Sequence, residues 1–124
     1  MGDVQSIVES LVRGNAFRAA VLTDEFGLPL GAFPTGARSE APAATVAQIR
    51  RMFDRIHRRV GLRTMDAVTV RDDAGQRLVC RRVVVGEHDL ILAVLVPPGR
   101  PSRQAVDQAV SEIRQVFSSM GSGT

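Results

Sequence analysis

The sequence predicts an α+β fold, within the broad α/β class, in which helices sandwich a single five-stranded antiparallel sheet. Apolar residues recur at helical spacing in three stretches, and five further stretches have the apolar runs typical of strands. The order along the chain is α-β-β-α-β-β-β-α. With 124 residues, of which 44% are hydrophobic, the chain is expected to form one domain over 1–124, with an ordered core of about 3–120 and a flexible tail at 121–124.

The first elements are a helix and a hairpin. Residues 3–14 are predicted to form an amphipathic helix, with Asp3 as its N-cap and Gly14-Asn15 as its end. A hairpin follows at 18–33, because two apolar runs flank an acidic turn that contains a glycine. Pro29 cannot donate a hydrogen bond to a ladder, so the second strand of this hairpin is expected at an edge of the sheet.

The remaining elements follow from the same patterns. "LILAVLV" is the most continuously apolar strand, so it is expected at the centre of the sheet, next to "AAVLT" of the hairpin. The strand "DAVTV" is then the edge opposite Pro29. A loop at 34–42 leads to a helix predicted at 43–60. Strands follow at 66–70, 77–85 and 90–96, joined by turns at "RDDAGQ" and "GEHD". Ser102 is the expected N-cap of the last helix, and the tail "MGSGT" comes after that helix.

The edge strand at 66–70 lacks the usual features that prevent edge-to-edge pairing. It has no proline, no lysine and no charge between Asp66 and Arg71, and an exposed regular edge invites pairing with another chain. Two such edges related by a two-fold axis can pair antiparallel, so we predict a homodimer. Replacing Val68 by proline is expected to remove a donor from this pairing and to give a monomer.

Three stretches of the chain resemble the roadblock/LC7 family, whose bacterial members include MglB-like regulators of small Ras-like GTPases. They are the hairpin "AVLTDEFGLPLGAF", the strand pair "DAVTVRDDAGQRLVCRRV" and the strand-to-helix segment "DLILAVLVPPGRPSRQAV". The resemblance extends over about residues 3–120. It implies a profilin/longin-like fold with the middle helix on one face of the sheet and the terminal helices on the other.

The family resemblance also implies a function and a dimer interface. It implies a non-enzymatic adaptor or regulator that binds a small Ras-like GTPase and modulates its GTP hydrolysis or its localisation. It implies a dimer formed through the middle helix and the edge strand after it. The interface residues expected on this basis are Met52, Ile56, Ala67, Val68, Thr69 and Val70.

The middle helix carries a row of exposed arginines, and every basic residue of the chain is an arginine. We expect Arg51, Arg55, Arg58 and Arg59 to bind an acidic patch on a partner protein; a solvated helix surface is the alternative interpretation. An arginine-rich nucleic-acid-binding module is a rival function, disfavoured because the chain has no Tyr or Trp on which bases could stack. A small-molecule sensor domain is a further alternative, and 4% aromatic residues give little material for its pocket.

No enzyme chemistry, cofactor or metal site is expected. The absence of lysine excludes the phosphate-binding Walker A sequence and Schiff-base chemistry. His57 and His88 have no ligand-spaced partner, Asp72-Asp73 belong to a turn, and Cys80 is expected to be a buried apolar side chain. Arg81 and Arg82 are adjacent in a strand and must point to opposite faces, so at least one is expected to reach a covering helix or an interface and to pair with a carboxylate there. The single cysteine excludes an intrachain disulfide, and with no signal peptide or apolar span the protein is expected in the cytoplasm without a membrane partner.

Overall fold

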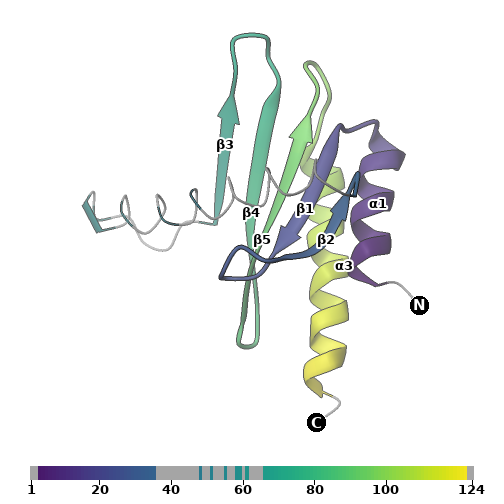
Figure 1. The fold of residues 1–124 in the computed structure, drawn as a ribbon, viewed down its shortest axis with the longest axis vertical. Helices are drawn as coiled ribbons and strands as arrows, with labels where there is room; N and C mark the ends of the chain where they lie inside the picture. Colours follow the sequence, from purple (N-terminus) through teal and green to yellow (C-terminus); the bar gives the residue numbers. More distant parts are fainter. Residues whose placement is uncertain are drawn as a thin grey trace.

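A five-stranded antiparallel sheet organises the computed structural model, which describes residues 3–35, 48, 51, 55, 58–59, 61 and 66–122 of the chain (Figure 1). The strand order is β2-β1-β5-β4-β3, so the predictions of a central fifth strand beside the first and of the two edge strands are confirmed. The elements are helix α1 (Val4–Asn15), strands β1 (Ala19–Thr23), β2 (Pro29–Phe33), β3 (Ala67–Arg71), β4 (Arg77–Val85) and β5 (His88–Val96), and helix α3 (Arg103–Ser122).

The predicted middle helix is described at five positions. Gln48, Arg51, Arg55, Arg58 and Arg59 are helical, as expected from the sequence pattern over 43–60. The rest of that segment, including the predicted interface residues Met52 and Ile56, lies outside the described residues.

Helix α1 begins as predicted and ends slightly later. The Asp3 carboxylate accepts a hydrogen bond of 2.7 Å from the backbone N–H of Ser6, which is the expected N-cap. The predicted stop at Gly14-Asn15 is wrong by a residue, because Asn15 is still helical and the left-handed residue after it is Ala16, with a φ of 54°. The side chain of the next residue, Phe17, is buried in the core, and this apolar contact stabilises the turn without a glycine.

The hairpin between β4 and β5 is tighter than predicted. Only Gly86 and Glu87 form the turn, whereas the expected turn "GEHD" included His88 and Asp89. Both of those residues are paired in the ladder, opposite Val85 and Val84. A two-residue hairpin turn needs a positive φ at its first central position, and Gly86 supplies it at 58°.

The main core lies between the sheet and the two terminal helices, which lie side by side on one face (Figure 1). The apolar residues of α3 that recur at helical spacing face this core: Val106, Ala109, Val110, Ile113 and Phe117 are buried, and Val116 is partly buried against them. Helical residues continue to Ser122, past the predicted start of the tail. Of the described residues, no helix is long and apolar enough to cross a membrane.

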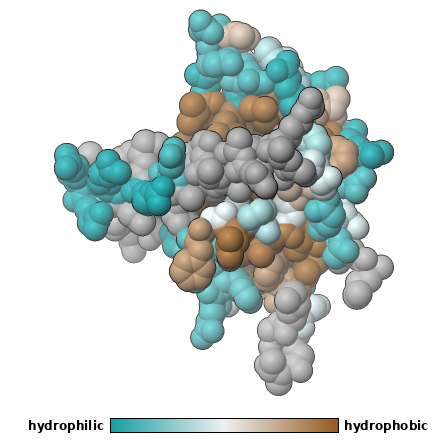
Figure 2. All heavy atoms as spheres, viewed as in Figure 1, coloured by the Kyte–Doolittle hydropathy of each residue, from teal (hydrophilic) through white to brown (hydrophobic). Residues whose placement is uncertain are grey.

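The other face of the sheet carries a second, smaller apolar cluster. Its buried members come from four adjacent strands, and Val68 of β3 and Leu78 of β4 pack against them. Figure 2 shows apolar residues, coloured brown, above and below the atoms drawn in grey. The buried residues of this cluster are Val21, Ala32, Cys80, Ile91 and Ala93.

Candidate functional site

The edge of the sheet at β2 is closed by helix α1. The side-chain amide of Gln5 donates to the carbonyl of Ala32 at 2.8 Å and accepts from the N–H of Ala32 at 3.0 Å. This side chain therefore makes both hydrogen bonds that a residue of a neighbouring strand would make. Pro29 contributes no N–H at the start of the same strand. A further strand could add to β2 only by displacing α1.

The close approach of α1 to this edge depends on a glycine. A Cβ atom on Gly31 would lie 2.7 Å from Cγ1 of Val4 and 3.3 Å from the carbonyl carbon of the same residue. Any larger residue at this position would push the helix away from the strand, and with it the side chain of Gln5. The sequence carries this requirement as "PLGAF", where the glycine interrupts an otherwise apolar strand.

The opposite edge, at β3, is open among the residues that the structure describes. The N–H of Arg82 donates to the carbonyl of Asp66 at 2.7 Å, and the N–H of Asp72 donates to the carbonyl of Gln76 at 3.0 Å. Hydrogen-bonding direction alternates along an antiparallel strand, so the even-numbered residues of β3 face β4 and the odd-numbered residues face outward. The outward N–H and C=O groups are those of Ala67, Thr69 and Arg71.

This alternation corrects one expectation from the sequence. Val68 is paired with Cys80, and its N–H points into the sheet, away from the open edge. A proline at Val68 would therefore break the β3–β4 ladder instead of removing a donor from a dimer interface. Within the predicted interface segment, the outward donors are Ala67 and Thr69, while Val68 and Val70 contribute their side chains. Whether these residues pair with a second copy stays a prediction.

The side chains of β3 make this edge partly apolar. Val70 is an unusually exposed large apolar residue, with 48% of its surface accessible. Val68 is half-buried beside Cys80 and Leu78. An exposed valine next to unpaired backbone groups is a feature that folded proteins usually avoid at a free edge.

The arginines predicted to bind a partner share one side of the middle helix. Arg51, Arg55, Arg58 and Arg59 are all helical and exposed. At about 100° per residue, these positions fall within an arc of about 100° around the helix axis. The four guanidinium groups therefore form one continuous positive surface, whose role in binding stays a prediction.

Arg81 and Arg82 take the structural roles expected for them. Arg81 donates to the carboxylate of Asp107 at 2.5 Å and so connects β4 to α3. Arg82 points to the other face and makes two hydrogen bonds, of 2.8 and 2.9 Å, to the carboxylate of Asp89. The expectation that at least one of them reaches a covering helix and pairs with a carboxylate there is confirmed by Arg81, and Arg82 is bonded to a carboxylate as well.

The candidate catalytic residues are in structural positions wherever they are described. His88 lies against the ring of Phe117, with 4.9 Å between the ring centroids. Cys80 is fully buried, and this burial raises the pKa of its thiol to about 11, so the nucleophilic thiolate is disfavoured at neutral pH. The carboxylate of Asp72 accepts from the backbone N–H groups of Ala74 and Gln76, as expected for a turn. His57 lies outside the described residues, and within them no three potential metal ligands come together.

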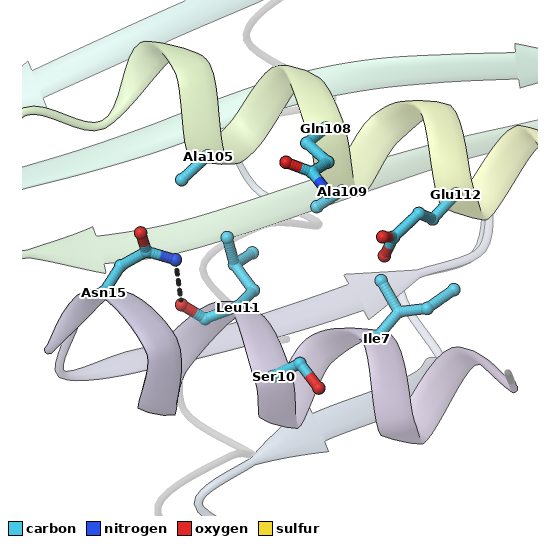
Figure 3. Close-up of a pocket in the computed structure, with 8 residues that line it drawn as sticks. All are labelled: Ile7, Ser10, Leu11, Asn15, Ala105, Gln108, Ala109 and Glu112. Carbon is cyan, nitrogen blue, oxygen red and sulfur yellow. Dashed lines mark hydrogen bonds between the residues drawn. The ribbon is translucent and has the colours of Figure 1, made fainter.

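A small groove lies between the two terminal helices, on their outer side (Figure 3). Its volume is about 160 Å³, which is below the range typical of sites for small organic ligands. Glu112 is the charged residue of its lining, and Asn15 bonds to the carbonyl of Leu11 at 2.9 Å. The lining residues are Ile7, Ser10, Leu11, Asn15, Ala105, Gln108, Ala109 and Glu112, none of which is aromatic.

Comparison with solved structures identifies the architecture. Myxococcus xanthus MglB superimposes with a TM-score of 0.77 at 15% sequence identity, over 94% of this chain and 95% of that one. The chain has the fold of the roadblock/LC7 family. A roadblock/LC7 domain from Streptomyces avermitilis (TM-score 0.73, 18% identity, 94% and 98% of the two chains) and a gliding protein MglB from Thermus thermophilus (TM-score 0.73, 16% identity, 94% and 92%) agree with this assignment. In sequence, no protein-family model and no curated protein matches the chain.

Proposed function

We propose that this protein is a non-enzymatic, homodimeric regulator that binds a small Ras-like GTPase and modulates its GTP hydrolysis or its localisation. The observation that carries the proposal is the likeness of fold to MglB, which extends over 94% of the chain at a TM-score of 0.77.

The open edge at β3 supports the dimeric part of the proposal. It presents the N–H and C=O groups of Ala67, Thr69 and Arg71 beside the exposed side chain of Val70. A second copy related by a two-fold axis offers the same groups in the antiparallel direction, so every outward donor finds an acceptor. The opposite edge cannot take part, because Gln5 already occupies it.

The arginine surface of the middle helix supports a protein partner that is acidic. Guanidinium groups bind carboxylates with two parallel hydrogen bonds, and several on one surface steer a partner of opposite charge. A nucleic acid is the weaker candidate partner, because the chain has no Tyr or Trp on which bases could stack and charge attraction would have to supply most of the binding.

The test is binding to purified small Ras-like GTPases of the source organism, each loaded with GDP or with a non-hydrolysable GTP analogue. We expect nucleotide-dependent binding in titration calorimetry, and a changed single-turnover rate of GTP hydrolysis if the effect is on catalysis. The double reversal Arg51→Glu/Arg55→Glu should abolish binding and leave the dimer intact. The matched control Arg100→Glu/Arg103→Glu makes the same charge change on another part of the chain and should bind as the wild type does.

Two outcomes would contradict the proposal. If no GTPase of the organism binds in either nucleotide state, the partner class is wrong. If the wild type instead binds arbitrary duplex DNA tightly at ~0.15 M salt, the rival nucleic-acid function is favoured.

A further inference from the structure

Charged residues are segregated between the two ends of the sheet. Five arginines lie at the end that carries the β3–β4 turn, the β5–α3 connection and the α1–β1 connection, which is the upper end in Figure 1. Two of them are anchored at this end, since the guanidinium of Arg18 donates to the side chain of Gln76 at 2.5 Å and that of Arg77 donates to the backbone carbonyl of Arg100 in the β5–α3 connection. We call this surface the basic end; its residues are Arg18, Arg71, Arg77, Arg100 and Arg103.

The charge of the basic end is not neutralised among the described residues. The carboxylates at this end are Asp72 and Asp73, and Asp72 accepts from backbone N–H groups of its own turn. None of the five arginines forms an ion pair with a described residue. Arg103 also begins α3, whose first turn contains no acidic residue, although helix N-termini favour negative side chains. Five arginines and two carboxylates leave a net charge of +3 at the basic end, and part of this positive charge lies at a helix N-terminus, where negative charge is favoured.

The opposite end of the sheet has the complementary character. The register places the β1–β2 and β4–β5 turns there together, because Thr23 is opposite Ile91. The β1–β2 turn contains two acidic residues and two large apolar residues that are strongly exposed, Phe26 at 77% and Leu28 at 61%. Exposure of this extent in a single hairpin turn indicates a contact surface. We call this surface the acidic tip; its residues are Asp24, Glu25, Phe26, Leu28 and, from the β4–β5 turn, Glu87.

We propose that the acidic tip of one copy docks on the basic end of a second copy, head to tail. The two surfaces are opposite in charge, and each arginine can bind a carboxylate through two parallel hydrogen bonds. The apolar residues also have a place to pack, because Pro98 and Pro101 are exposed between the arginines of the basic end. Phe26 can in addition lie under a guanidinium group, an arrangement that is attractive in proteins.

This contact does not rest on the proposed GTPase regulation, and it differs from pairing at the β3 edge, where Arg71 takes part through its backbone groups and not through its guanidinium. It joins two different surfaces, so each added copy leaves one basic end and one acidic tip free, and association continues with concentration instead of closing at two copies. Pairing at β3, in contrast, joins two identical surfaces and closes at a dimer.

The experiment is sedimentation velocity of the full chain over a concentration series, at ~50 mM and at ~0.5 M salt, because exposed charges are screened at the higher value. We expect the wild type to form species larger than a dimer that grow with concentration at low salt and disappear at high salt. Arg100→Glu/Arg103→Glu and Glu25→Arg/Glu87→Arg should each abolish this growth. Phe26→Ser, which changes no charge, should weaken it about tenfold or more, as expected for an apolar anchor.

The two charge-reversed variants also control for each other. One carries negative charge at both ends and the other positive charge at both ends, so an equimolar mixture should regain the growth that neither shows alone. Circular dichroism verifies that each variant is folded. The inference is wrong if the wild type keeps one size across the low-salt series, if both reversals assemble as the wild type does, or if the folded variants fail to assemble when they are mixed.

Discussion

A proline at Thr69 is the sharpest perturbation of the open edge. The N–H of this residue points away from β4, and edge strands tolerate proline where the N–H faces outward. Thr69→Pro should therefore leave the fold of the monomer intact and remove one donor from each copy in the dimer. The outcome does not depend on the register of the dimer, because in any antiparallel pairing the odd-numbered residues of β3 supply the hydrogen bonds.

The size of the effect follows from the number of bonds lost. Two donors disappear per dimer, and each backbone hydrogen bond contributes about 1 kcal/mol net. The loss is therefore about 2 kcal/mol, which weakens dimerisation about 30-fold. It is larger if the acceptor carbonyls left behind are shielded from water.

The assay is sedimentation equilibrium at salt high enough to suppress electrostatic association, with thermal unfolding of each variant measured alongside. The matched control is Val68→Pro, which removes a hydrogen bond to Cys80 within the same chain and should lower the unfolding temperature. A dimer that is as tight in Thr69→Pro as in the wild type would refute strand pairing at this edge. A strong loss of monomer stability in Thr69→Pro, matching that of Val68→Pro, would refute the assignment of inward and outward residues.

Four further predictions concern stability and reactivity. Gly31→Ala should destabilise the fold by about 1–3 kcal/mol in urea unfolding through overpacking against α1. Adding Val4→Ala should recover part of this loss, because it removes the atom that lies 2.7 Å from the new Cβ. Purely additive effects of the two changes would argue against the contact. Thr23→Val should stabilise the protein by about 1 kcal/mol, because the hydroxyl of Thr23 is buried with no hydrogen-bond partner among the described residues. A loss of stability in the same urea unfolding would indicate that the hydroxyl does make a hydrogen bond. Cys80 should resist alkylation near pH 8 until the protein unfolds, because burial raises the pKa of its thiol to about 11. The hydrogen bond from the backbone N–H of Ser6 lowers the pKa of Asp3. Its contribution to stability is therefore fully present above the ordinary carboxyl pKa and is lost as the pH falls through the lowered pKa of the folded state, and Asp3→Asn should remove that part of the pH dependence.

The strand order and the exposed edges could be predicted from the sequence because they follow from apolar content. The limits of β4 at Arg77–Val85 agree with the predicted 77–85, since the apolar run is bounded by turn residues on both sides. The central place of β5 follows from its continuous apolar run. The position of Pro29 at an edge follows from its missing N–H.

The features that decide how the edges behave could not be predicted in this way. Gln5 is one of several polar residues of an amphipathic helix, and nothing local marks it as the partner of Ala32, which lies 27 positions further along the chain. The direction of the Val68 N–H depends on the pairing of β3 with β4, and a shift of one residue would reverse it. The exposure of Phe26 in the β1–β2 turn also depends on the tertiary fold, because any segment packed over that turn would bury the side chain.

The closure of the β2 edge by Gln5 limits what strand pairing can build. A sheet with two open edges could add copies at both and extend without end. Here the β2 edge already has both hydrogen bonds of Ala32 satisfied by a side chain, and the packing of α1 on Gly31 holds that side chain in place. Only β3 remains for pairing among the described strands, and a two-fold pair of β3 edges leaves neither copy with a free edge. Strand pairing therefore ends at two copies, and any larger assembly of this chain must use surfaces outside the sheet edges, such as the basic end and the acidic tip.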